Sequence, residues 1–89
     1  MFCIGQFQIY DSQFPDHEGQ HLDFAKEIQD VVREINKDLP ESRYIGNVWV
    51  SCQIKLEIGA KGGYGRMTSI ECYDSDHVQM VVDIIKKYS

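Results

Sequence analysis

Eleven consecutive residues in the middle of the chain, VWVSCQIKLEI at positions 48–58, alternate between two kinds of side chain. Even-numbered positions, from Val48 to Ile58, are apolar throughout, while Trp49 is followed by polar residues at the odd-numbered positions. A period of two is typical of a β-strand that buries one face. The segment therefore predicts a sheet, and a second layer has to cover its apolar face.

A hairpin partner for this strand is expected at residues 66–73, RMTSIECY, after the glycine-rich segment GAKGGYG. A turn centred near Gly62 places Ile54 opposite Ile70 and Cys52 opposite Cys72, so the apolar sets of both strands fall on one face. Residues 2–10, FCIGQFQIY, alternate less regularly and predict a further strand at the start of the chain.

Two segments change to a helical period. In residues 21–39 apolar side chains recur every three or four positions, and Pro40 ends the pattern. Residues 74–89 repeat that spacing, with Ser75 or Asp76 expected as the N-cap. The order β-α-β-β-α predicts one small α+β domain spanning residues 1–89. The expected fold is ferredoxin-like (split βαβ) without its final strand, with both helices on one face of a three-stranded antiparallel or mixed sheet.

The other face of this sheet is expected to carry aromatic and amide side chains. Tryptophan and tyrosine are enriched on surfaces that partners bury. We therefore predict that this face, or the exposed edge of the first strand, binds a protein partner or a second copy of the chain. The residues predicted to make this contact are Tyr10, Trp49, Gln53 and Tyr73.

The segment His17-Glu18-Gly19-Gln20-His21 matches the H-E-x-x-H pattern of zinc peptidases, whose two histidines bind metal from one helical face. Pro15 and Gly19 place His17 in the loop or the first helical turn instead, where His21 is expected to be exposed and Asp16 to be the N-cap. We therefore predict no metal site and no cofactor, and keep a metal-dependent hydrolase using His17 and His21 as a minor alternative.

The glycine-rich segment 59–66 is expected to be a flexible hairpin connection. The sharper alternative is an anion or small-molecule site formed by Lys61, Arg66 and the loop amides, as in a ligand-binding regulatory module. Three cysteines occur, each within an apolar run, which predicts free buried thiols rather than a catalytic or metal-binding cluster.

Charge is distributed unevenly along the chain. The net charge is −5, and residues 11–41 hold nine acidic and three basic side chains. Clustered acids disfavour nucleic acid and favour a basic protein partner. The acidic face predicted on the first helix consists of Asp23, Glu27, Asp30 and Glu34.

With no membrane-spanning run and no recognisable secretory signal, the chain is expected to be cytoplasmic. The leading functional hypothesis is a small acidic protein-binding module of the inhibitor, immunity or accessory kind that forms a homodimer, with an enzyme kept as an alternative. This hypothesis is based on the small size and the acidic charge of the chain.

Overall fold

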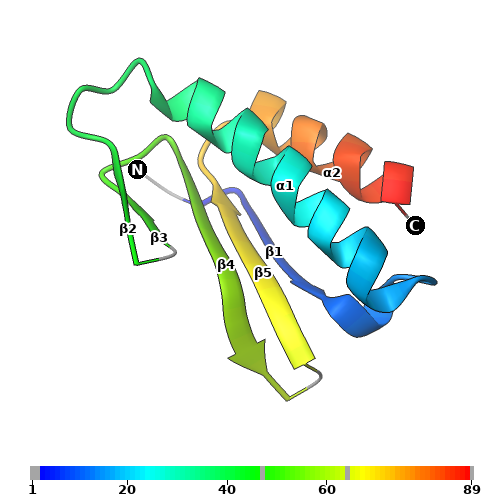
Figure 1. Cartoon of the computed structure of the whole chain (residues 1–89). Coiled ribbons are helices and arrows are strands. Elements are labelled where there is room, and N and C mark those ends of the chain that lie inside the picture. Colours follow the sequence, from blue (N-terminus) through cyan, green and yellow to red (C-terminus); the bar gives the residue numbers. More distant parts are fainter. Residues whose placement is uncertain (1–2, 47, 64, 89) are drawn as a thin grey trace.

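The computed structural model describes residues 3–46, 48–63 and 65–88. These residues form a helical layer and a sheet, and both helices lie on the same face of the sheet (Figure 1). The elements in chain order are β1 (Gly5–Tyr10), the 3-10 turn η1 (Asp11–Gln13), α1 (His17–Asn36), β2 (Arg43–Ile45), β3 (Val48–Val50), β4 (Ile54–Gly62), β5 (Gly65–Cys72) and α2 (Ser75–Tyr88). Neither α1 nor α2 combines the length and apolar character that crossing a membrane requires.

The predicted three-stranded, ferredoxin-like sheet is wrong. The described residues form a five-stranded sheet in the order β1-β5-β4-β3-β2, and every neighbouring pair is antiparallel. One extra strand, β2, consists of residues 43–45, for which no strand was predicted. It pairs with β3, and Gly46, which follows β2, has a φ of 51°. The position of a glycine that tolerates positive φ between two apolar runs is the signal that could have predicted this hairpin.

The predicted continuous strand at 48–58 is interrupted at residues 51–53. Ser51 has a φ of 53°, in the left-handed region that residues other than glycine rarely adopt. The backbone turns there, and β3 and β4 are paired in register only at Val48 and Glu57. Trp49 is buried before the interruption, whereas Ile54 is buried after it. The buried positions therefore change from odd to even numbers, which strict alternation cannot anticipate.

The side chain of Asn36, at the last residue of α1, holds this interruption against the helix. Its Nδ2 donates to the carbonyl oxygen of Ile54 at 3.2 Å. Its Oδ1 accepts from the backbone N–H of Gln53 at 2.9 Å and from that of Ile54 at 3.2 Å. Asn36 is fully buried. These bonds satisfy backbone groups that would otherwise be costly to bury beside a strand interruption.

The hairpin of β4 and β5 is present, but its predicted register is wrong by two residues. Ile54 lies opposite Cys72, and Leu56 opposite Ile70. A shift of two keeps every side chain on its expected face, so all four still point into the core. Cys52 lies outside β4, in the interruption, and is only half-buried.

The core lies between the helices and β4 and β5. Phe24, Ile28 and Val32 of α1 and Val81 of α2 pack onto the apolar face of these strands. Helix α1 begins at His17 with Asp16 as its N-cap, as predicted, which is four residues before the apolar periodicity starts. Helix α2 begins at Ser75, and the N–H of Asp76 donates to Asp74 Oδ1 at 2.8 Å. Asp74 therefore caps α2, in place of the predicted Ser75 or Asp76.

Candidate functional site

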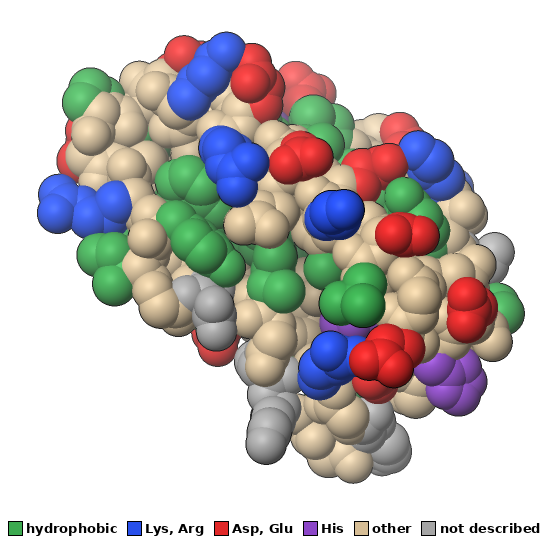
Figure 2. All heavy atoms as spheres, in the orientation of Figure 1, with side chains coloured by type: hydrophobic (Ala, Val, Ile, Leu, Met, Phe, Trp, Pro, Cys, Tyr) green, Lys and Arg blue, Asp and Glu red, His purple; other side chains and the backbone are tan. Residues whose placement is uncertain are grey.

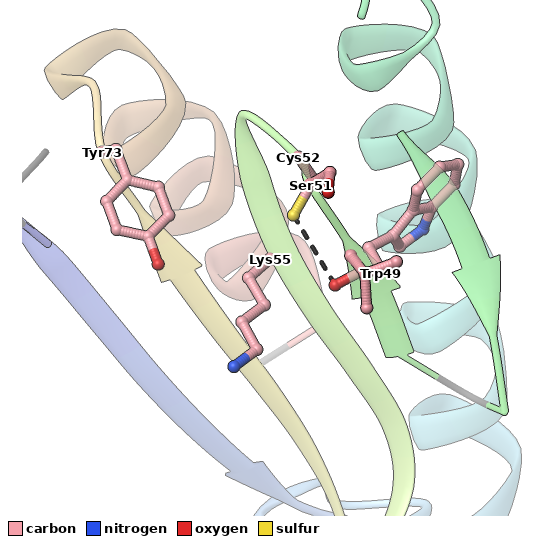
Figure 3. Close-up of a pocket in the computed structure, with 6 residues that line it drawn as sticks. Trp49, Ser51, Cys52, Lys55 and Tyr73 are labelled. Carbon is pink, nitrogen blue, oxygen red and sulfur yellow. Dashed lines mark hydrogen bonds between the residues drawn. The ribbon is translucent and has the colours of Figure 1, made fainter. Parts of the chain in front are cut away.

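A hollow of about 430 Å³ opens on the sheet face that carries no helix (Figure 3). It lies where β3 and β4 separate, next to the end of β5. Ser51, whose positive φ lies in the interruption between these two strands, is one of its lining residues. The lining residues are Trp49, Val50, Ser51, Cys52, Lys55 and Tyr73.

The polar groups of this hollow favour binding over covalent chemistry. The Cys52 thiol donates to the carbonyl oxygen of Trp49 at 3.7 Å, and burial raises the pKa of Cys52. The Tyr73 hydroxyl donates to Glu71 Oε2 at 2.9 Å, and this hydrogen bond raises the pKa of Tyr73 to about 12. Both groups stay protonated at neutral pH, so neither is an activated nucleophile. Because both protons are already donated within the protein, the exposed Lys55 ammonium is the charged donor that the lining side chains offer a ligand.

The four residues predicted to bind a partner do not form one surface. Gln53 and Tyr73 line a smaller adjoining hollow of about 130 Å³. Tyr10 lies at the opposite end of the sheet, beside Gly62. The expectation that Trp49 points outward is wrong: it is only 8% exposed and belongs to the core. In Figure 3 its indole points away from Cys52 and Tyr73. Whether any of the four contacts a partner stays a prediction.

The two histidines of the H-E-x-x-H segment have different environments. His17 is the first residue of α1 and is exposed. His21 was expected to be exposed, but it is only 2% exposed, and its Nε2 lies 3.2 Å from Thr68 Oγ1. Burial lowers the pKa of His21, although the nearby Asp11 carboxylate opposes this effect. Within the described residues, no three His, Cys, Asp or Glu side chains are grouped so that they could hold a metal ion.

His21 and Thr68 form a buried polar contact that the sequence pattern does not reveal. Thr68 is on the core face of β5, and the ring of Phe14 packs beside His21 with centroids 5.7 Å apart. Phe14 lies in the short segment between η1 and α1 and is buried. Phe14, an apolar residue directly before Pro15, is the local signal that this segment covers the first turn of α1.

The glycine-rich segment 59–66 was expected to be a flexible connection, but β4 continues to Gly62 and β5 begins at Gly65. Arg66 is therefore a strand residue, and it is not a free cation. Arg66 reaches toward the start of α1, where its Nη2 lies 3.0 Å from Glu18 Oε1 and its Nε lies 3.9 Å from Asp11 Oδ2. These two carboxylates compete with any anion for the guanidinium. The side chain of Lys61, the other residue of the predicted anion site, lies outside the described part of the chain.

Most of the predicted acidic face is exposed on α1. Asp23, Asp30 and Glu34 meet solvent, whereas Glu27 is half-buried and binds Lys87 of α2 at 2.7 Å. Beside Asp30 and Glu34 an apolar groove of about 350 Å³ runs between the two helices. The apolar periodicity of α1 predicted which side of this helix is buried. It did not predict which apolar residues α2 leaves exposed.

The two edges of the sheet differ in length and charge. β2 has three residues and begins with Arg43. β1 has six residues, GQFQIY, and pairs with β5 without a register shift. Among the described residues, no strand pairs with the other side of β1. The chain was compared with protein-family models, with curated proteins and with solved structures, and none of the three comparisons gave a match.

Proposed function

We propose that the protein is a small protein-binding module whose partner at the β1 edge is a second copy of the chain. The observation that carries this proposal is the length and neutrality of that edge. Native sheets protect their edges with charged residues, prolines, bulges or short strands. β2 is short and carries Arg43, whereas β1 is longer and its six residues include neither a charge nor a proline.

The side chains of β1 are compatible with pairing about a two-fold axis perpendicular to the sheet. Such an axis keeps the helices of both copies on the same side of the joined sheet. A side chain on the helix-covered face of one copy therefore lies opposite a side chain on the helix-covered face of the other. Pairing Phe7 with Phe7 of the second copy brings Gln6 opposite Gln8. Pairing Gln8 with itself brings Phe7 opposite Ile9. In either register apolar side chains meet apolar ones, and amides meet polar groups.

Incomplete burial at this edge supports the same proposal. Phe7 and Ile9 pack against the core but stay half-buried, whereas Ile70, the neighbour of Phe7 on β5, is fully buried. Strand pairing would cover their remaining apolar surface. A stable interface needs roughly 1,000 Å² of buried surface. We therefore expect contacts from α2 as well, which passes so close to β1 that a Cβ on Gly5 would lie 2.5 Å from Val78 Cγ2.

The uncovered sheet face is a weaker candidate for the contact between copies. Its centre holds Lys55, Glu57 and Glu71, which line a small polar hollow together with Ser69. Burying these charges against a second sheet would require a partner for each of them, because a desolvated unpaired charge is costly. Edge pairing leaves all three in solvent.

Sedimentation velocity over a range of concentrations tests the proposal. The wild-type protein should sediment with twice the mass of the 10.3 kDa chain. The double variant Gln6→Lys/Gln8→Lys places like charges opposite one another across the axis and should weaken dimerisation about tenfold. It also reduces the net negative charge, so general repulsion between acidic chains cannot explain dissociation. Circular dichroism verifies that the variant is folded.

The matched control is Ile45→Lys/Val50→Lys, which adds the same two charges at exposed positions near the opposite edge. It should leave the dimer unchanged. A wild-type protein that is monomeric at every concentration contradicts the proposal. So does a control that dissociates while the Gln6→Lys/Gln8→Lys variant stays dimeric, since the contact would then involve the β2–β3 end of the sheet.

A further inference from the structure

The groove between α1 and α2 has an apolar floor that reaches the surface. Val31 and Ile35 lie one turn apart on α1, and Met80 faces them from α2. Met80 remains 39% exposed. Methionine side chains adapt to apolar ligands of different shapes, and a groove between two helices can accept an amphipathic helix along its length.

Acidic side chains flank this floor on both helices. On α1, Asp30 and Glu34 line the groove itself. On α2, Asp76 and Asp83 are exposed and lie within about one turn of Met80, on its side of the helix. Figure 2 shows hydrophobic side chains along the helical layer with both acidic and basic side chains around them.

The present partners of these acids are weak competitors. Asp30 is 3.4 Å from Arg33, and Glu34 pairs with Lys37, both three residues away on the same exposed helix surface. Exposed pairs of this kind contribute little because solvent screens them. Asp83 accepts a hydrogen bond from Gln79, and Asp76 has no cation within ion-pair distance in the described residues. All four carboxylates are accessible to cations of a partner.

From this arrangement we infer that the groove binds a basic amphipathic helix of a partner protein. Apolar side chains of that helix would rest on Met80, Val31 and Ile35. Its Lys and Arg residues, on the flanks of the apolar stripe, would pair with the acids of α1 and α2. Acidic rims repel nucleic acid phosphates and anionic lipid headgroups, so charge complementarity selects a basic protein segment.

This inference does not depend on the proposed dimer. The groove lies entirely within one copy, on the helical layer, and the β1 edge does not contribute to it. If the dimer forms, the two-fold axis places two such grooves on the same side of the assembly. A bivalent basic partner would then bind more tightly than a single helix.

Fluorescence anisotropy with the full-length protein tests the inference. The probe is a labelled Leu/Lys peptide of about 18 residues, five helical turns, with leucines on one face. Two comparison peptides are a scrambled version of the same composition and a Leu/Glu version with the same leucine spacing. The amphipathic Leu/Lys peptide should bind at least about fivefold more tightly than either comparison peptide.

Matched variants locate the binding site. The double variant Asp30→Asn/Glu34→Gln should weaken binding of the Leu/Lys peptide by about fivefold. The variant Glu41→Gln/Glu57→Gln removes the same charge from outside the helical layer and should change the affinity less than twofold. Met80→Gln should weaken binding with no change in charge. Sedimentation verifies that these variants keep the oligomeric state of the wild type.

Three results would overturn the inference. Equal weakening by the two double variants would show that the peptide responds to net charge alone. Equal binding of the scrambled peptide would remove the role of the apolar floor. Unchanged affinity of Met80→Gln would place the peptide elsewhere. None of these results bears on the β1 edge, whose test is the mass of the particle.

Discussion

Replacing Asn36 with alanine should destabilise the protein more than any exposed substitution on the same helix. The change removes a fully buried side chain and its three hydrogen bonds, at 3.2, 2.9 and 3.2 Å, to the backbone of Gln53 and Ile54. At about 0.5–1.5 kcal/mol each, the lost bonds amount to roughly 3 kcal/mol. Alanine returns about 0.5 kcal/mol through its higher helix propensity.

Urea denaturation followed by circular dichroism measures this loss as a lower transition midpoint at unchanged slope. We expect the free energy of unfolding to fall by about 2–3 kcal/mol. For a domain of this size the melting temperature should fall by roughly 10–20 °C. The control is Asp38→Ala, at an exposed position two residues further along, which should change the free energy of unfolding by less than about 0.5 kcal/mol.

Amide hydrogen exchange adds a local test. In Asn36→Ala the N–H groups of Gln53 and Ile54 lose their acceptor and should exchange faster, relative to the amides of β5, than in the wild type. The reasoning is refuted if Asn36→Ala loses less than about 1 kcal/mol, or if the two amides keep their protection. Either result would mean that the turn at Ser51 holds its shape without the side chain of Asn36.

Two further predictions concern a buried histidine and the cysteine thiols. Burial lowers the pKa of His21 below its ordinary value of 6.5, so the unfolded chain binds more protons just below that pH. The free energy of unfolding should therefore fall as the pH decreases from 6.5 toward the folded-state pKa. Urea titrations at several pH values should show a weaker pH dependence of this free energy for His21→Gln than for the wild type. An equal pH dependence for both proteins would contradict this. For the thiols, Cys3 is exposed, whereas burial raises the pKa of Cys72 to about 11. Cys3→Ser should abolish the fast phase of labelling by a thiol reagent in the native protein, and loss of that phase in Cys72→Ser instead would contradict the structure.

Local patterns predicted the two helices and the β4–β5 hairpin well. Their signals are strong because each element buries one continuous face: Phe24, Ile28 and Val32 on α1, and Ile54 and Leu56 on β4. Hairpins and amphipathic helices are formed by residues that are close in sequence, so their apolar periodicity can be recognised from the sequence alone. The predicted register of the hairpin was wrong, because a shift of two residues keeps both apolar sets on the same face and so leaves the alternation unchanged.

The candidate binding surfaces were predicted only in part. The acidic face of α1 and the open edge of the first strand follow from charge pattern and strand order. The groove at Met80 does not, since it requires the position of α2 relative to α1. The hollow near Tyr73 requires the bend at Ser51, where serine in the left-handed region has no local sequence signal.

The sequence by itself determined which segments are amphipathic, where the acids gather and that one face of a sheet is covered by helices. Tertiary structure decided which residues fill the ends of the core. Trp49 is buried because the chain bends after β3 and Asn36 satisfies the backbone at that bend. His21 is buried because Phe14 and Thr68, distant in sequence or outside any regular element, close over it. Periodicity predicts which face of a single helix or strand is buried. It does not predict these contacts, because they join segments that are far apart in the sequence or that have no regular structure.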